Sequence, residues 1–174
     1  MMTTRRPLTF TPVTGATSGI GLELAGQAAA DGRDLILVAR HVPDLKAVAE
    51  ELRRSVTVHT IAQDLSQPGA AEKVYEQVQV IDAEVDCLIN NAGFGDYGEF
   101  ATSDLVKQER MIGVNVAALT GLTRLFLPRM LERGQGRILN VASVTGFLPG
   151  PFRGADRGIA GQWREGHGTV PAAE

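Results

Sequence analysis

The chain has 174 residues, of which 44% are hydrophobic and 21% charged, and its net charge is -3. This composition predicts one soluble globular domain, and the slight negative charge excludes a general attraction to nucleic acid or anionic membranes. We expect no membrane-spanning run, no secretory signal and no metal site, and the single cysteine, Cys87, cannot form an internal disulfide, so we expect a cytoplasmic protein.

Strand-like and helix-like segments alternate along the first 150 residues. Apolar runs predict strands at residues 8–13, 35–39, 56–62, 85–89 and 137–143. Helical spacing predicts helices at residues 19–30, 43–54 and 69–81, and a long helical region from the N-cap Ser103-Asp104 to about Arg133. Pro12 is expected to weaken the first strand because it removes a ladder donor.

This alternation predicts the fold class α/β, a Rossmann-like doubly wound parallel sheet with strand order 3-2-1-4-5. In such sheets a ligand binds at the carboxyl ends of the strands. Polar or special residues follow several predicted strands at that edge: Arg40, Asp64, Asn90-Asn91-Ala92-Gly93 and Ser143. The predicted ligand site therefore lies along this edge of the sheet.

A glycine-rich turn joins the first predicted strand to the first helix. Its spacing is Gly-x-x-x-Gly-x-Gly, at Gly15, Gly19 and Gly21, with hydroxyl groups at Thr14, Thr17 and Ser18. Glycine adopts positive φ without strain, and the following helix presents unpaired N–H groups and its positive dipole end, so this turn suits a pyrophosphate. The alternative is a turn that merely connects strand and helix.

Taken together, these motifs resemble the short-chain dehydrogenase/reductase family over residues 8 to about 152. The resemblance rests on Thr14-Gly-x-x-x-Gly19-Ile20-Gly21, Asp64-Leu65, Asn90-Asn91-Ala92-Gly93, Asn115 within Gly113-Val114-Asn115-Val116, and Ser143. It implies an oxidoreductase that transfers a hydride between NAD(P)(H) and a small-molecule carbonyl or alcohol substrate. It also implies a homo-oligomer, weakened here by the absence of the family's later segments.

The resemblance assigns cofactor-binding roles residue by residue. Gly15, Gly19 and Gly21 would hold the pyrophosphate, with neighbouring contacts from Thr17, Ser18 and Ile20. Asp64 and Leu65 would line the adenine pocket, and Asn91, Ala92 and Gly93 would follow the nicotinamide ribose. Thr14 and Asn90 are expected to tie the glycine turn to the fourth strand.

Arg40 carries the cofactor preference. An acid directly after the second strand accepts the ribose 2′-hydroxyl of NAD, whereas an arginine there accommodates the 2′-phosphate of NADP. The residue here is Arg40, followed by His41, so NADP(H) is favoured over NAD(H). The alternative is that Arg40 is only a solvated surface charge.

The catalytic set that the resemblance implies is incomplete. Ser143 and Asn115 match its serine and asparagine, but the family's Tyr-x-x-x-Lys pair is absent. About a dozen residues past Ser143, Asp156 and Ala160 stand where that pair should fall, and the last lysine is Lys107. A tyrosine needs a nearby cation to ionise near neutral pH, so we expect little or no turnover.

Residues 1–152 therefore form an incomplete NAD(P)-binding Rossmann domain, and residues 153–174 an irregular, disordered tail that lacks the family's C-terminal strands and helices. The fifth strand is expected to be an open edge. Three hypotheses remain: an oxidoreductase lineage with little activity, an NADPH-binding pseudoenzyme or sensor, and a non-functional truncated product. A reading-frame change near Arg153 would account for the tail.

Overall fold

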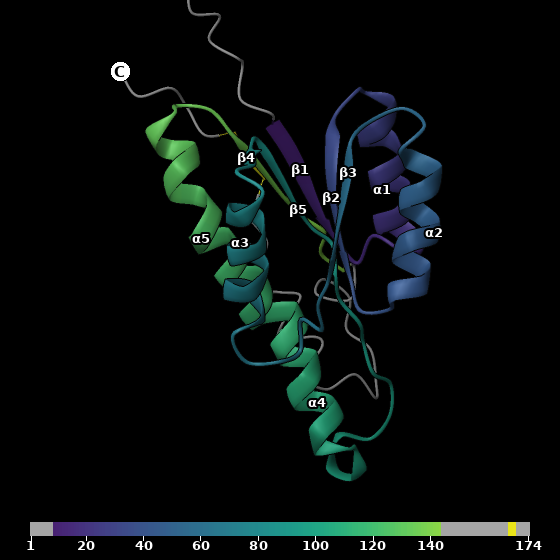
Figure 1. Cartoon of the computed structure of the whole chain (residues 1–174). Coiled ribbons are helices and arrows are strands. Elements are labelled where there is room, and N and C mark those ends of the chain that lie inside the picture. The colour runs from purple at the N-terminus through teal and green to yellow at the C-terminus, as the bar shows by residue number, and fades with distance from the viewer. Residues whose placement is uncertain (1–8, 144–166, 170–174) are drawn as a thin grey trace, which may run out of the picture.

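A sheet runs through the middle of the molecule, with helices on both faces (Figure 1). The computed structural model describes residues 9–143 and the backbone of residues 167–169. Its strands are β1 Thr9–Thr14, β2 Asp34–Ala39, β3 Val58–Ala62, β4 Glu84–Val85, β5 Cys87–Asn90, β6 Arg137–Asn140 and β7 His167–Thr169. They lie in the order β3-β2-β1-β5-β6-β7, with β4 paired to β1, which confirms the predicted doubly wound topology.

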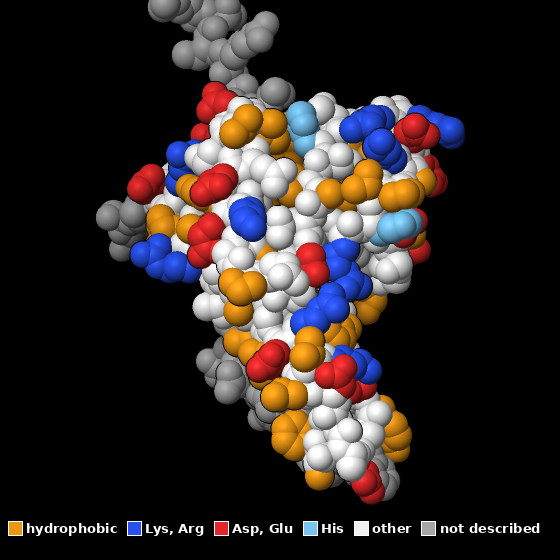
Figure 2. Space-filling view, turned by 60° about the horizontal axis from the view of Figure 1, so that its bottom comes forward, with side chains coloured by type: hydrophobic (Ala, Val, Ile, Leu, Met, Phe, Trp, Pro, Cys, Tyr) orange, Lys and Arg blue, Asp and Glu red, His pale blue; other side chains and the backbone are white. Residues whose placement is uncertain are grey.

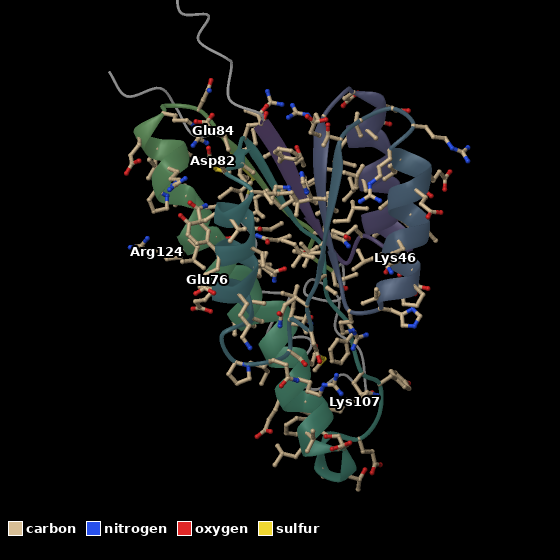
Figure 3. The ribbon with its side chains drawn as sticks, in the orientation of Figure 1. Lys46, Glu76, Asp82, Glu84, Lys107 and Arg124 are labelled. Atoms are coloured by element: carbon tan, nitrogen blue, oxygen red, sulfur yellow. The ribbon has the colours of Figure 1, made fainter. Side chains whose placement is uncertain are left out.

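The helices form one layer on each face of the sheet. α1 (Gly19–Ala30) and α2 (Val42–Leu52) cover one face, and α3 (Ala70–Val80) and α5 (Leu119–Glu132) cover the other, whereas α4 (Leu105–Ile112) extends beyond the ends of the strands (Figure 1). Polar ends of side chains such as Glu76 and Arg124 point outward from these helices (Figure 3).

Each face of the sheet has its own hydrophobic core because side chains alternate along a strand. Leu35 and Leu37 of β2 pack toward α1 and α2, whereas Ile36 and Val38 pack in the other cluster, with α3 and α5. All four are fully buried, which explains why β2 is apolar throughout. β2 therefore packs against both helical layers, and Arg40 follows directly at its carboxyl end.

The predicted long helix exists, but it is not uniform. Asp104 caps it by accepting hydrogen bonds from Val106 N (2.9 Å) and Lys107 N (3.4 Å). Between α4 and α5, residues Gly113–Ala118 form a π-helical segment. Such widened turns often occur at functional sites, and this one carries Asn115.

The same helix corrects one expectation from composition. The 28 residues Leu105–Glu132 are long and apolar enough to cross a membrane, contrary to our expectation that no run would be. However, Leu122, Phe126 and Met130 are buried in the core shared with α3 and the sheet. A core helix passes the same test of length and composition, so this is weak evidence for a membrane span.

Pro12 lies in the middle of the central strand β1, where its missing N–H is accommodated by a β-bulge. Phe10 pairs with Val85, and Val13 pairs with Ile89. Three residues, Asp86–Leu88, therefore lie opposite only two residues of β1, Thr11 and Pro12. The N–H of Asp86 donates to Phe10 O (3.4 Å). In a regular parallel ladder the Asp86 carbonyl would then accept from residue 12, but proline has no N–H, and this carbonyl accepts from Arg137 N on β6 (2.9 Å). The predicted fourth strand is therefore divided into β4 and β5.

The far edge of the sheet differs from the prediction in two ways. β6 ends at Asn140, so Ser143 lies beyond the strand rather than closing it. The expected open edge is wrong, because β7 pairs antiparallel with β6, with Leu139 level with His167. Residues 167–169 of the tail are thus a strand and not irregular, while residues 153–166 and 170–174 lie outside the described residues.

Gly121 marks the close approach of α5 to α3. A Cβ there would lie 2.7 Å from Ala71 Cβ, whereas a Cβ on Gly26 of α1 would meet nothing within 4 Å. We therefore predict that Gly26→Ala stabilises the protein by about 0.5–1 kcal/mol through helix propensity. Gly121→Ala should destabilise it by about 1 kcal/mol or more, since the helices must separate. Chemical denaturation of the two variants checks this pair, and equal stabilisation would contradict it.

Candidate functional site

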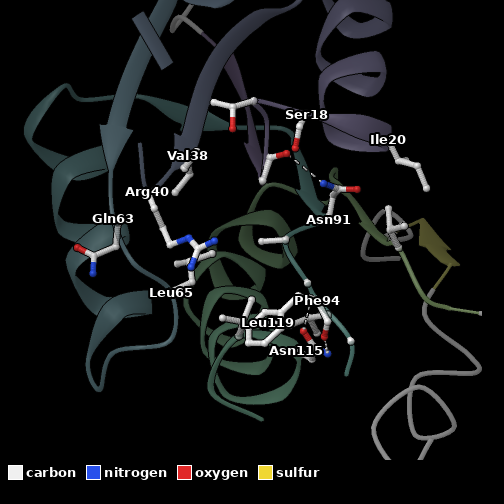
Figure 4. Close-up of a pocket in the computed structure, with 18 of the residues that line it drawn as sticks. Ser18, Ile20, Val38, Arg40, Gln63, Leu65, Asn91, Phe94, Asn115 and Leu119 are labelled. Carbon is white, nitrogen blue, oxygen red and sulfur yellow. Dashed lines mark hydrogen bonds between the residues drawn. The ribbon is translucent and has the colours of Figure 1, made fainter. Parts of the chain in front are cut away.

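A cavity of about 690 Å³ lies at the carboxyl ends of the parallel strands, as expected for this fold (Figure 4). It is bordered by segments that are far apart in the sequence: the glycine turn, the end of β2, the turn after β3, the loop after β5, the π segment and the end of β6. The predicted site residues that line it are Gly15, Thr17, Ser18, Ile20, Arg40, Leu65, Asn91, Ala92, Gly93, Asn115 and Ser143. Three others, Gly19, Gly21 and Asp64, are not among its lining residues.

The glycine turn is held closely against its surroundings. Gly15 has a φ of +66°, and its N–H donates to Val38 O at 2.8 Å. Gly21 lies behind the turn, where a Cβ would be 2.3 Å from both Gly15 O and Asn91 Nδ2. Gly15 therefore supplies the backbone conformation, and Gly21 lets α1 pack directly against the turn.

The first turn of α1 is left open to an anion. Ser18, its N-cap, makes no side-chain capping hydrogen bond, and the first turn contains no acidic residue. Ser18 and Ile20, at this end of the helix, border the cavity (Figure 4). Unpaired N–H groups and the helix dipole together favour a phosphate here.

Thr14 and Asn91 join the ends of β1 and β5. Thr14 Oγ1 accepts hydrogen bonds from Asn91 N and Ala92 N, each at 2.9 Å, and donates to Ile89 O at 3.4 Å. The Asn91 amide donates in return to Thr14 O (3.0 Å). The predicted tie between the glycine turn and the fourth strand therefore exists, and Thr14 makes it.

Asn90 makes a different connection from the one expected. Its buried amide donates to Thr123 Oγ1 on α5 (3.1 Å) and to Asn140 Oδ1 on β6 (2.9 Å). It thus links β5 to its other neighbour and to the helical layer, away from the glycine turn. Because Asn140 lines the cavity, this bond also fixes one side of the site.

Arg40 extends from the end of β2 into the cavity (Figure 4). It is exposed and makes no hydrogen bond or ion pair with any residue that the structure describes. Two neighbours, His41 and Asp44, also line the cavity, and His41 Nδ1 lies 2.9 Å from Asp44 Oδ2. An unpaired guanidinium is available for a bound anion.

Asp64 does not line the cavity and is held by its own neighbours. Partial burial raises the pKa of this carboxyl, but hydrogen bonds from the Ser66 side chain and backbone and from Gln67, together with the Arg110 guanidinium, outweigh it and lower the pKa overall. Arg110 of α4 lies 3.3 Å from Asp64 Oδ2. In this arrangement Asp64 holds the turn that presents Leu65, which is buried and lines the cavity.

Asn115 holds the loop after β5 in place. Its side-chain oxygen accepts from Phe94 N (3.1 Å), and its amide donates to Phe94 O (2.9 Å). This reciprocal pair fixes Phe94, which lines the cavity beside Asn115 (Figure 4). Ser143 follows β6 and is exposed.

Further along the same loop, apolar side chains are exposed and do not border the cavity. Tyr97 and Phe100 are 69% and 62% exposed, and the adjacent Leu105 and Val106 of α4 are similarly exposed. Hydrophobic side chains gather at this tapered end of the molecule (Figure 2). Of the aromatic residues Phe94, Tyr97 and Phe100 in this loop, only Phe94 borders the cavity.

Sequence reasoning did not single out several of the residues that border the cavity. These are Val38, Ala39, His41, Asp44, Gln63, Gly95, Val114, Leu119, Asn140, Val141 and Ala142. Most are immediate neighbours of predicted residues at strand ends, so position relative to the predicted strands could have identified them. Asp44 and Leu119 needed the structure, because helices bring them to the edge of the sheet.

Comparison with known proteins agrees with the family resemblance of the sequence motifs. The sequence model described as short chain dehydrogenase matches residues 10–155 of this chain. The chain belongs to the short-chain dehydrogenase/reductase family. This family consists of oxidoreductases that bind NAD(P)(H) and act on small-molecule substrates, and many of its members are oligomeric.

Individual relatives of this short-chain dehydrogenase/reductase span more sequence than it does. An uncharacterized oxidoreductase, YvrD, from Bacillus subtilis is 37% identical over 139 residues, which are 80% of this chain and 52% of the relative. A short-chain dehydrogenase from Sphingobium yanoikuyae, solved in complex with NADPH, is 37% identical with a TM-score of 0.82, covering 88% of this chain and 61% of that one. A metagenomic short-chain oxidoreductase in complex with NADP is 31% identical, with a TM-score of 0.82 and coverage of 88% and 71%. The chain thus spans about half the length of the curated relatives it matches.

Thr14→Val tests the connection between β1 and β5. This near-isosteric change removes the acceptor of two backbone N–H groups, so we predict a loss of about 1–3 kcal/mol in unfolding free energy. Thr11→Val on the same strand is the matched control, because the buried Thr11 Oγ1 has no hydrogen-bond partner in the described structure. That variant should be neutral or stabilising. Denaturant titration measures both, and a larger loss for Thr11→Val would overturn this account.

Asp64→Asn tests the turn beside the cavity through its pH dependence. Because the folded-state pKa of Asp64 is lowered, its carboxylate contributes stability above the unfolded pKa, near 4, and loses it as pH falls through the folded value. We predict that the variant is less stable than wild type by about 1 kcal/mol at pH 7. The difference should shrink on acidification below about pH 4. A difference that stays constant down to pH 2.5 would show that the charge contributes nothing.

Proposed function

We propose that this chain binds NADP(H) in the cavity at the carboxyl ends of its strands, with Arg40 contacting the 2′-phosphate of the adenosine ribose. The observation that carries this proposal is the Arg40 guanidinium, which enters the cavity directly after β2 and has no hydrogen-bond or ion-pair partner among the described residues (Figure 4). An arginine in this position suits a 2′-phosphate, whereas an acid would suit the free 2′-hydroxyl. Two similar solved structures, from Sphingobium yanoikuyae and from a metagenome, hold NADPH and NADP respectively.

The rest of the cofactor would follow the cavity from Arg40 toward Asn115. The glycine turn and the uncapped end of α1 would bind the pyrophosphate. Leu65 would contact the adenine, and Asn91 and Ala92 would lie along the nicotinamide ribose. NADP(H), when bound, supplies the hydride chemistry, and the side chains at its nicotinamide end would be those of Asn115 and Ser143.

We further propose that the chain transfers hydride with little or no efficiency, and acts as an NADP(H)-binding unit of an oxidoreductase lineage. Its tyrosines are Tyr75 and Tyr97, and its last lysine is Lys107. Tyr75 packs edge-on against Phe126 (5.1 Å between ring centroids) on the helical face, and Tyr97 is exposed at the tapered end. Neither lines the cavity, so neither supplies the proton donor that a carbonyl substrate needs.

Arg40→Asp tests the cofactor preference. We predict that it weakens NADPH binding about tenfold or more, since it replaces a charge-assisted contact with a repulsive one, and leaves NADH binding nearly unchanged. Arg54→Asp is the matched control, because Arg54 is exposed and does not line the cavity. Titration of the reduced cofactors by their own fluorescence measures both variants. Equal losses for NADPH and NADH on Arg40→Asp would overturn the proposed role of Arg40.

Turnover is tested separately from binding. The purified chain should bind NADPH saturably but should not oxidise it above the background rate in the presence of a panel of aldehydes and ketones. Absorbance at the reduced nicotinamide band follows this directly. Sustained oxidation would show that the chain is an active oxidoreductase, and the absence of binding would indicate a non-functional product.

A further inference from the structure

The ionisable side chains that line the described part of the cavity all lie within one short segment. They are Arg40, His41 and Asp44, at the junction of β2 and the first turn of α2. His41 is the N-cap residue of α2, and its side chain makes no capping hydrogen bond to the helix. Its imidazole is therefore available to the cavity and to Asp44.

The geometry of this pair assigns different tasks to the two ring nitrogens. His41 Nδ1 lies 2.9 Å from Asp44 Oδ2, an ion-pair distance when the imidazole is protonated, so Nδ1 is the ring nitrogen that faces the carboxylate. The other nitrogen, Nε2, is left to contact a ligand. Both side chains are more than half exposed, at 66% and 58%, so a ligand can reach them.

Protonation of this histidine changes the charge that a cofactor meets. Arg40 and Asp44 cancel each other, so the set is neutral when His41 is neutral and carries one positive charge when His41 is protonated. Other charged groups nearby do not line the cavity: Lys46 of α2 is exposed to solvent, and Asp64 and Arg110 pair with each other. The net charge at this end of the cavity therefore depends on His41.

We propose that His41, oriented by Asp44, is a second, pH-dependent contact for the 2′-phosphate and makes the preference for NADPH over NADH increase with acidity. This inference rests on the proposed NADP(H) binding. A phosphate monoester carries between one and two negative charges near neutral pH and accepts hydrogen bonds from charged donors. Protonated Nε2 would supply such a donor, and NADH, which lacks this phosphate, would gain little from it.

Asp44 also sets the balance between the two cofactors. Its carboxylate opposes a phosphate while His41 is neutral and is compensated when His41 is protonated. A carboxylate near the ribose also suits a free hydroxyl, as in NAD-binding sites. Histidine changes charge between pH 8 and pH 5, so this compensation would vary over a physiological range.

The test measures dissociation constants for NADPH and NADH at pH 8.0 and pH 6.5, with the full chain at constant ionic strength. We expect NADPH affinity to rise about three- to fivefold on acidification in wild type, which is modest because the pair is exposed. His41→Asn should remove most of that rise, and asparagine is itself a good N-cap, so α2 should persist. His59→Asn is the control, because His59 of β3 packs against Phe10 of β1 and does not line the cavity.

Asp44→Asn supplies an independent arm. Removal of this carboxylate should strengthen NADPH binding severalfold at pH 8.0, where it is least compensated, and should change NADH binding little or weaken it. An unaltered pH response in His41→Asn, an equal response for NADH, or weaker NADPH binding in Asp44→Asn would each overturn this inference alone. If wild type binds neither cofactor at either pH, the proposed function itself fails, and this inference fails with it.

Discussion

The site depends on one hydroxyl group, that of Thr14. It lies where β1 ends and accepts two backbone hydrogen bonds from the residues that follow β5. This contact fixes the spacing between the glycine turn and the Asn91-Ala92-Gly93 segment, the two backbones between which the cofactor would lie. These hydrogen bonds restrict independent motion of the two segments. Gly21, which has no side chain, also lets α1 pack directly against the glycine turn.

Much of this arrangement could be predicted because parallel sheets impose it. The apolar run at 35–39 predicted a strand buried on both faces, and the structure places it there because helices cover both sides of the sheet. The polar residues expected along one edge meet around a single cavity since every parallel strand presents its carboxyl end to that edge. The local hydrophobic pattern was sufficient to predict a strand or helix wherever the composition of that one segment determined its burial.

Prediction was less complete where the outcome depended on a partner strand. Pro12 looked unfavourable in isolation, but the structure shows an extra residue on the neighbouring strand, and neither sequence segment by itself indicates that compensation. The edge of β6 could not be assigned either, because its partner, residues 167–169, has no strand periodicity. Asp64 illustrates the same difficulty for a side chain, since its orientation depends on Ser66 and on Arg110, which is 46 residues away.

The bulge at Asp86 has a consequence for how this region can vary. Along a strand, successive side chains point to opposite faces, so a single added or deleted residue exchanges the two faces of everything that follows. The extra residue opposite Thr11 and Pro12 therefore sets the phase in which Asn90 and Asn91 arrive beside Thr14. A deletion at Asp86 would shift Asn90 and Asn91 by one residue relative to Thr14. This segment therefore cannot change in length without losing the contacts that shape the site. Asp86, the single residue between β4 and β5, thus acts as a spacer that keeps the two strands in phase.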